Sequence, residues 1–303
     1  MNGLSKLIIG SKPIDGGHFI FSGDQRDAFL ATEPQAAPYI RSYIGAREFL
    51  NGGDRHILCA ATIPPQEFKN MPQTKAVIAQ VREYRLGNIP AKGKDESTMK
   101  TPGMSSLSLA ETPTAFHVTV LPKTPFLVLP EVSSERREYA PIGWLEPPTV
   151  PSNLVRIVAN ATRPEFSILT SAMHMAWLRT FGGRLKSDYR YSIGLVYNTF
   201  PMPTAKDLSK LETHAQAILD ARAKFPDTTL AELYDPDIMP AELRRAHLAN
   251  DKAVDKLYRK SGFASERERV EHLFMLYEKM TAGMLAAEKK PKKRKVKPKA
   301  AKP

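Results

Sequence analysis

The chain has 303 residues, of which 42% are hydrophobic and 25% are charged. This composition is close to the average for soluble globular proteins, so it excludes global disorder and collagen-like structure. No apolar run approaches the roughly 18 residues that a membrane span needs, and Lys6 and Lys12 interrupt the first apolar stretch, which argues against a signal peptide. A single cysteine, Cys59, can form no internal disulfide, which fits a reducing compartment such as the cytoplasm.

The formal net charge of +12 is unevenly distributed along the chain. Residues 289–303 hold eight lysines and one arginine and no acidic residue, so they supply nine of those charges. The rest of the chain therefore carries only three. A basic tail of this kind is expected to be disordered and to bind any polyanion weakly. Specific contact with nucleic acid would depend on how charge is arranged in the body of the protein.

The first part of the chain predicts short strands mixed with helices. Glycine pairs indicate turns, alternating aromatic and β-branched residues indicate strands, and apolar residues at helical spacing indicate helices. The predicted elements are, in order, a strand ending at Phe21, a helix capped by Ser22 or Asp24, a strand over 55–61, a helix over 64–86 and an exposed loop over 87–113.

Strands return after residue 114, and helices dominate from residue 204. The apolar pattern predicts strands within 115–129 and over 155–158, a helix over 166–181, and further helices over 207–225, 230–234, 241–259 and 265–287. The chain is therefore predicted to be an α+β protein. We divide it into a strand-rich domain over 1–203, a small helical domain over 204–287 and a disordered lysine-rich tail over 288–303.

Motifs of common catalytic, cofactor and metal sites are missing from the sequence. It has no glycine-rich dinucleotide loop, no P-loop, no His-Glu-x-x-His and no Gly-x-Ser-x-Gly. His117 and His174 are isolated, which is typical of packed or surface histidines, and Cys59 is expected to be a buried, inert thiol. The carboxylates of 235–237 flank a proline, which is more typical of a turn than of an acid–base pair. No catalytic residue and no metal ligand are assigned.

Two polar segments, 132–139 and 182–192, each follow an apolar element directly. Both carry Arg and Ser together with Tyr, and such loops held by rigid elements suit DNA recognition. Arginine can bind guanine O6 and N7 in bidentate fashion, while Ser, Lys and Tyr can hold phosphates. Residues 123–190 hold seven Arg and two Lys against six acidic residues, however. On spacing alone, salt-bridged surface loops explain the pattern at least as well.

Several stretches, spread in order over residues 9–283, carry a more specific signal. They include 10–17, 39–41, 48–52, 111–113, 132–137, 141–143, 168–177, 183–192, 233–236, 245–247, 253–255 and 268–274. In these stretches the chain resembles the C-terminal half of the type IIL (MmeI-like) restriction–modification DNA methyltransferases. The resemblance implies a target-recognition domain followed by a C-terminal helical domain, in a bacterial or phage-borne, cytoplasmic protein associated with the nucleoid.

In that family an upstream domain binds S-adenosylmethionine and methylates adenine N6 in DNA. Its signature is a glycine-rich cofactor loop and an Asn-Pro-Pro-aromatic tetrad, and residues 198–201 lack the paired prolines. The resemblance thus implies no cofactor on this chain. We expect catalysis to need a separate methyltransferase or endonuclease chain, or the chain to be the surviving 3′ part of a split gene. A complete enzyme with unrecognised motifs and a protein-interaction subunit remain alternatives.

The resemblance implies that the two polar segments contact double-stranded DNA. Four arginines are expected at base edges or nearby phosphates, namely Arg136, Arg137, Arg184 and Arg190. Phosphate contacts are expected from Ser133, Ser134, Lys186 and Tyr191. Glu135 and Asp188 are candidate salt-bridge partners of these arginines. Tyr189 and Tyr191 alternate in a predicted strand, where a core or rim position is the more usual role.

Overall fold

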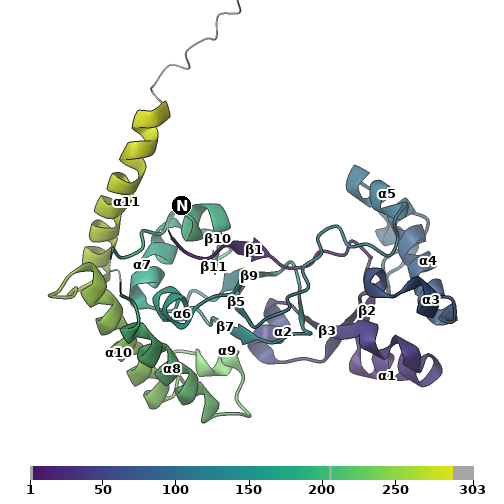
Figure 1. Cartoon of the computed structure of the whole chain (residues 1–303), viewed down its shortest axis with the longest axis horizontal. Coiled ribbons are helices and arrows are strands. Elements are labelled where there is room, and N and C mark those ends of the chain that lie inside the picture. The colour runs from purple at the N-terminus through teal and green to yellow at the C-terminus, as the bar shows by residue number, and fades with distance from the viewer. Residues whose placement is uncertain (1–2, 205–206, 289–303) are drawn as a thin grey trace, which may run out of the picture.

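The computed structural model describes residues 3–204 and 207–288. It confirms the α+β class, with three small sheets and a group of C-terminal helices. Figure 1 shows two lobes joined by a narrow waist, the C-terminal helices belonging to the larger lobe. No helix among the described residues is long and apolar enough to cross a membrane. The predicted disordered tail, apart from residue 288, lies outside the described residues.

The larger lobe is built on a four-stranded antiparallel sheet that is covered on both faces. Its strand order is β1 (Leu7–Ile9), β9 (Val155–Ala159), β5 (Phe126–Pro130) and β7 (Gly143–Leu145). In β5, Leu127 and Leu129 join the core under the helices, whereas Phe126 and Val128 pack in a second cluster with Phe49. Because both faces are buried, this strand is a continuous apolar run.

Helices cover the larger lobe from two regions of the chain. They are α6 (Arg163–Leu169), α7 (Ala172–Phe181), α8 (Lys210–Ala223), α9 (Leu230–Leu233), α10 (Ala241–Tyr258) and α11 (Glu266–Glu288). The single helix predicted over 166–181 is two helices, because the Ser171 side chain caps α7 by accepting from the His174 amide. Trp177, Leu211 and Leu273 belong to one hydrophobic core. The domain boundary at 203 stays a prediction, and the packed core runs across it.

The smaller lobe has its own four-stranded sheet and its own core. The strand order is β2 (Ile20–Ser22), β4 (Arg55–Leu58), β3 (Ile40–Ile44) and β8 (Val150–Pro151), and the helices are α1 (Gly23–Thr32), α3 (Pro65–Phe68), α4 (Pro72–Leu86) and α5 (Met104–Ala110). Helix α2 (Ala46–Asn51) follows β3 but packs Phe49 and Leu50 against the sheet of the larger lobe. The short 3-10 segments are η1 (Pro34–Tyr39), η2 (Ala60–Thr62) and η3 (Glu96–Thr98). As predicted, Ser22 caps α1, in a capping box with Gln25. Cys59 is buried in this core, as expected.

Three local predictions for this lobe are wrong. The helix predicted over 64–86 is split into α3 and α4, and the loop predicted over 87–113 contains η3 and α5. Residues 115–120 form no strand, and only an isolated bridge joins Val118 to Lys12. The physical reason for α5 is tertiary. The Arg85 guanidinium donates to the carbonyl of Leu109 in its last turn at 2.9 Å, a contact that local composition does not reveal.

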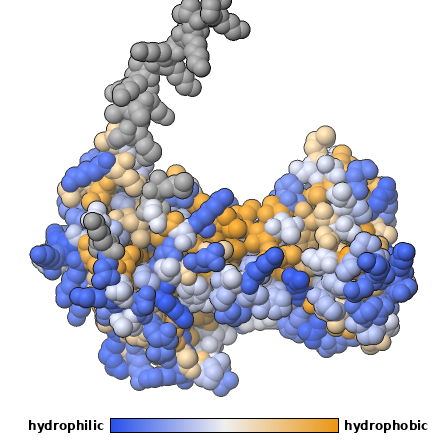
Figure 2. Space-filling model, viewed as in Figure 1, coloured by the Kyte–Doolittle hydropathy of each residue, from blue (hydrophilic) through white to orange (hydrophobic). Residues whose placement is uncertain are grey.

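The waist between the lobes is a close crossing of main-chain segments. A Cβ added at Gly10 would lie 2.2 Å from the carbonyl oxygen of Ser152, so only glycine fits there. Next to it, the fully buried Ser11 hydroxyl donates to the Val120 carbonyl at 2.9 Å and accepts from the Val120 amide at 2.8 Å. Figure 2 shows that the surface is hollowed between the lobes. The crossing fixes how the two lobes are joined.

Candidate nucleic-acid interface

The third sheet brings the two polar segments together. It consists of β10 (Gly183–Leu185), β11 (Asp188–Arg190) and β6 (Val132–Ser133), in that order and antiparallel. Tyr189 is paired with Ser133, and Arg190 with Val132. Residues that lie more than fifty positions apart in sequence are therefore neighbours in one sheet.

Lys186 lies in the tight turn of this sheet. Lys186 and Ser187 connect β10 to β11, and Lys186 has φ +57°, in the left-handed region. This conformation reverses the chain within two residues, and it leaves the Lys186 side chain exposed at the tip of the hairpin. An ammonium group in this position can reach a phosphate without displacing any neighbour.

Arg184 is held flat against the sheet by Tyr189. Its guanidinium carbon lies 4.0 Å from the centre of the Tyr189 ring, and its Nη1 donates to the Ser187 carbonyl at 2.9 Å. The Glu135 carboxylate lies 3.8 Å from the same nitrogen. Glu135 is thus a partner of Arg184, as expected, whereas Asp188 accepts only from the Glu135 main-chain amide, at 3.4 Å. The arrangement gives Arg184 a fixed plane from which to contact a ligand.

Arg190 is oriented by a carboxylate that sequence reasoning missed. Its Nε donates to Glu131 Oε1 at 3.0 Å, while Glu131 Oε2 pairs with Arg156 at 2.9 Å. Glu131 is only 15% exposed, whereas the Arg190 side chain is 59% exposed. Within the described residues, the two terminal nitrogens of Arg190 have no hydrogen-bond partner. They remain available for a bidentate contact.

The loop after β6 carries the other two arginines. Arg136 extends into solvent and pairs with Asp237 at 2.5 Å, both side chains being more than half exposed. Arg137 is half-buried, donates to the Ser133 hydroxyl at 3.3 Å, and has its pKa lowered by burial. The Ser134 hydroxyl accepts from the Arg136 amide at 3.3 Å. In this conformation both serine hydroxyls therefore hold the loop, and Arg136 is the more accessible cation.

Tyr191 lies in the core, which does not fit the phosphate contact expected of it. The side chain is 4% exposed, and its hydroxyl lies 2.8 Å from His174 Nε2. Burial raises the pKa of Tyr191 well above its ordinary value and lowers the pKa of His174 to about 3, so both are neutral. The core role weighed for Tyr189 and Tyr191 is the one that the structure shows. Tyr189 and Tyr191 therefore pack on the core side of the sheet.

We call the set of Arg136, Arg137, Arg184, Lys186 and Arg190 the arginine surface. Its cations are paired mostly with carboxylates, an arrangement that can exchange one anion for another and so bind phosphates or base edges. Within the described residues, no three or more His, Cys, Asp or Glu side chains gather as a metal site. The only sequence signal for Glu131 was an acidic residue at the end of a buried strand.

Comparison with known proteins identifies the family. A family model described as "MmeI, target recognition domain" matches residues 1–204, and one described as "MmeI, C-terminal domain" matches residues 197–285. The chain belongs to the MmeI family. The resemblance found in the sequence is thereby confirmed.

Two relatives show how much of an MmeI-like protein this chain represents. DNA methyltransferase A of Bacillus subtilis (strain 168) is 38% identical over 280 residues, which are 92% of this chain and 30% of that protein. The solved structure of the type IIL restriction–modification enzyme MmeI in complex with DNA matches with a TM-score of 0.84 and 38% identity, over 92% of this chain and 36% of that chain. The chain spans about a third of the length of these relatives.

Proposed function

We propose that this chain is the sequence-specific, double-stranded DNA-binding portion of an MmeI-like adenine-N6 DNA methyltransferase. The observation that carries the proposal is the β6–β10–β11 sheet, which brings the two arginine-bearing segments side by side, with Arg184, Lys186 and Arg190 exposed on it and Arg136 and Arg137 in the loop that follows β6. Support also comes from the MmeI structure, which matches nearly the whole chain and was solved with DNA. The matched portion does not include the S-adenosylmethionine-dependent catalytic domain, which would act from another part of a longer protein or from a separate chain.

Adenine methylation requires the target base to leave the helix stack. While it does so, the rest of the duplex must be held in register, and the neighbouring bases must be read. A bidentate contact between arginine and guanine gives roughly 1–3 kcal/mol of discrimination, whereas a phosphate contact only positions the duplex. In our proposal Arg184 and Arg190, which the sheet holds firmly, make such contacts. Lys186 and Arg136 hold phosphates.

The test replaces Arg184 and Arg190 singly with Ala in the full chain. A preferred site is first selected from random duplexes, and affinity for it and for a scrambled duplex is then measured against salt concentration. Loss of a base contact should weaken the preferred site roughly 5- to 150-fold and the scrambled one much less. Loss of a phosphate contact should weaken both equally and reduce the salt slope by about one.

Arg82→Ala provides the matched control, because Arg82 is a half-exposed arginine of α4 in the smaller lobe, paired only with its neighbour Glu83. It should bind both duplexes like the native chain. If Arg184→Ala and Arg190→Ala also bind with native affinity and native salt slope while remaining folded, the arginine surface does not contact DNA and the proposal fails.

A further inference from the structure

We infer that the C-terminal helices are a positioning device for DNA recognition, and that Tyr139 and Asp251 form its central anchor. The segment that they position, residues 134–142, is called the arginine loop here. The inference rests on the proposed function, because it concerns how Arg136 and Arg137 are presented to DNA. It gives the C-terminal helices a part in target recognition itself.

The arginine loop has no regular structure of its own between β6 and β7. Instead, side chains from the C-terminal part of the chain hold it along its length. The contacts are Asp237 to Arg136, Arg244 of α10 to Glu138, Asp251 of α10 to Tyr139 and Arg222 of α8 to the Ile142 carbonyl. Four of the nine loop residues are therefore fixed by residues beyond position 204.

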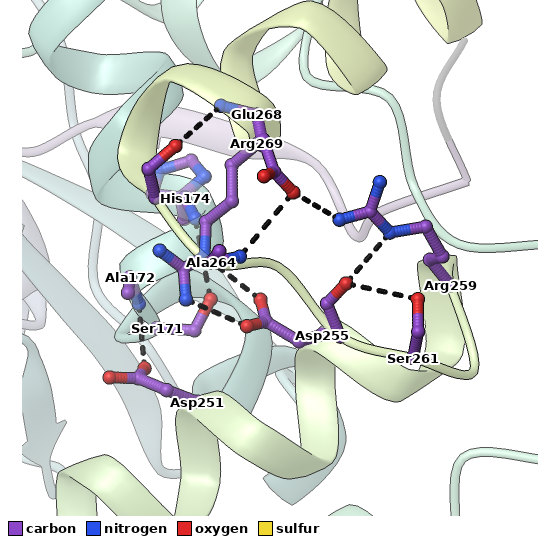
Figure 3. A network of polar contacts seen from close by, with 12 residues as sticks. Ser171, Ala172, His174, Asp251, Asp255, Arg259, Ser261, Ala264, Glu268 and Arg269 are labelled. Carbon is purple, nitrogen blue, oxygen red and sulfur yellow. Dashed lines mark hydrogen bonds and ion pairs between the residues drawn. The ribbon is translucent and has the colours of Figure 1, made fainter.

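Tyr139 is anchored through its side chain in the core. It is 2% exposed, and its ring stacks on His247 of α10 with the ring centres 4.1 Å apart. Its hydroxyl donates to Asp251 Oδ2 at 2.7 Å. The other Asp251 oxygen accepts from the Ala172 amide, at the start of α7, also at 2.7 Å (Figure 3). One carboxylate thus joins the arginine loop, α7 and α10.

The anchor is itself braced against the last helix. One turn beyond Asp251, Asp255 accepts two hydrogen bonds from Arg269 of α11, at 3.0 and 2.7 Å (Figure 3). On the other side of the loop, Arg179 of α7 donates to the Glu138 carbonyl at 3.0 Å and pairs with Glu266 of α11 at 2.5 Å. The arginine loop therefore packs against helices that are joined by ion pairs, α7 to α11 and α10 to α11.

Such bracing affects binding through conformational entropy. Ordering a free loop on DNA costs on the order of 1 kcal/mol per residue, and this cost is subtracted from the binding free energy. A loop that is already fixed avoids it, so Arg136 and Arg137 can contact DNA from a defined position. Loosening the anchor should weaken binding even though neither Tyr139 nor Asp251 is exposed to DNA.

The decisive comparison is between Tyr139→Phe and Ser167→Ala in the full chain. Each removes one buried hydroxyl that donates to a side chain on α10, since Ser167 donates to Asn250. We expect similar losses of thermal stability. Only Tyr139→Phe should weaken DNA binding, about three- to tenfold, with a smaller salt slope and faster amide exchange in residues 134–142.

Arg244→Gln is a second variant that leaves the core intact, because Arg244 and Glu138 are both more than one-third exposed. It should weaken binding in the same direction by a smaller factor. If Tyr139→Phe and Arg244→Gln bind like the native chain while Arg136→Ala binds weakly, the positioning role is overturned and the proposed function stands. If no arginine variant alters binding, the proposed function itself is overturned.

Discussion

Arg85 in the smaller lobe and the exposed arginines of the larger lobe are held in different ways. In the smaller lobe, Arg85 is fully buried and donates to six main-chain carbonyls, those of Pro13, Ile14, Leu109, Thr112, Pro113 and Ala115. In the larger lobe, Arg136, Arg184 and Arg190 are exposed and each faces a carboxylate. Arginine thus serves as an internal clamp at position 85 and as a surface cation at positions 136, 184 and 190.

The contrast shows which arginines can change partners. Carbonyls of the main chain are neutral and fixed, so Arg85 cannot leave them without exposing several buried acceptors. A carboxylate on the surface is an anion that another anion can replace, and phosphate has the same two-oxygen geometry. The local partner therefore separates arginines that hold the fold from arginines that can exchange one anion for another.

Arg85→Met should produce the largest effect, a loss of about 5 kcal/mol in the free energy of unfolding, since it leaves buried carbonyls unpaired. Chemical denaturation measures this loss. Arg82→Met, on the exposed face of the same helix, is the control and should change stability by less than about 0.5 kcal/mol. A small effect of Arg85→Met would show that the hydrogen bonds of Arg85 are not needed for stability. The contrast between the lobes would then not hold.

The contrast between buried and exposed charged groups also applies to carboxylates. The direct hydrogen-bond partners of the buried Asp251, the Tyr139 hydroxyl and the Ala172 amide, are neutral. Burial is the main cause that raises its pKa from 3.8 to about 6, while the hydrogen bonds from the Ala172 amide and the Tyr139 hydroxyl oppose the rise. The folded state thus favours the protonated form. Stability from this group is full below pH 3.8 and is lost as the pH rises through 6.

Relative to Asp251→Asn, the native chain should lose about 2.5 kcal/mol of unfolding free energy between pH 4 and pH 8. Urea denaturation of both proteins across this range measures the difference. All other titratable groups are the same in both proteins, so their contributions cancel in that difference. Parallel stability profiles would mean that Asp251 has an ordinary pKa in the folded chain.

Glu131→Gln should have a smaller effect, a stability loss of about 1 kcal/mol, because Glu131 joins two arginines and is nearly buried. It also removes a negative charge beside Arg190. We expect binding of scrambled duplex to increase about two- to fivefold at low salt, while preference for the selected site decreases. Glu135→Gln is the control for stability, which it should change less, because Glu135 and Arg184 are both about half exposed. An unchanged site preference in Glu131→Gln would show that Glu131 does not orient Arg190.

Asp237→Asn should have the smallest effect on stability, below about 0.5 kcal/mol, because both members of its ion pair are mostly exposed. Because this exposed pair contributes little to fixing the arginine loop compared with Tyr139, the main effect of the variant is to free Arg136 from a competing anion, and duplex binding at low salt should increase no more than about threefold. A double variant with Arg136→Ala should abolish that gain. Weaker binding by Asp237→Asn would instead show that the pair is needed to present Arg136.

Much of the fold could be predicted from the sequence where local signals are strong. The cap at Ser22, the buried strand around Val128 and the helices after residue 207 all follow from capping residues or apolar periodicity. Helix α5 could not be predicted, because its end is completed by Arg85 from a different helix. The break at Ser171 was missed for a different reason: its cap is local, but the apolar pattern continues across it.

The sequence predicted the separate segments of the candidate site but not how they come together. The two polar segments stood out because arginines follow apolar elements, but pairing of β11 with β6 joins positions too far apart for any local pattern. Tyr191 was expected at a phosphate and lies in the core, because alternation along β11 directs it inward. Glu131, Tyr139 and Asp251 were missed, since each acts through a partner that only the folded chain supplies.

Strand β1 limits where the protein can be truncated at its N-terminus. It is an edge strand whose partner β9 also pairs with β5, and Gly10 and Ser11 lead from it directly into the crossing between the lobes. A fragment beginning at Lys12 would leave β9 with an open hydrogen-bonding edge. It would also remove the two hydrogen bonds between the Ser11 hydroxyl and the main chain of Val120. Grafting this recognition unit onto another enzyme therefore requires a junction placed before Leu7.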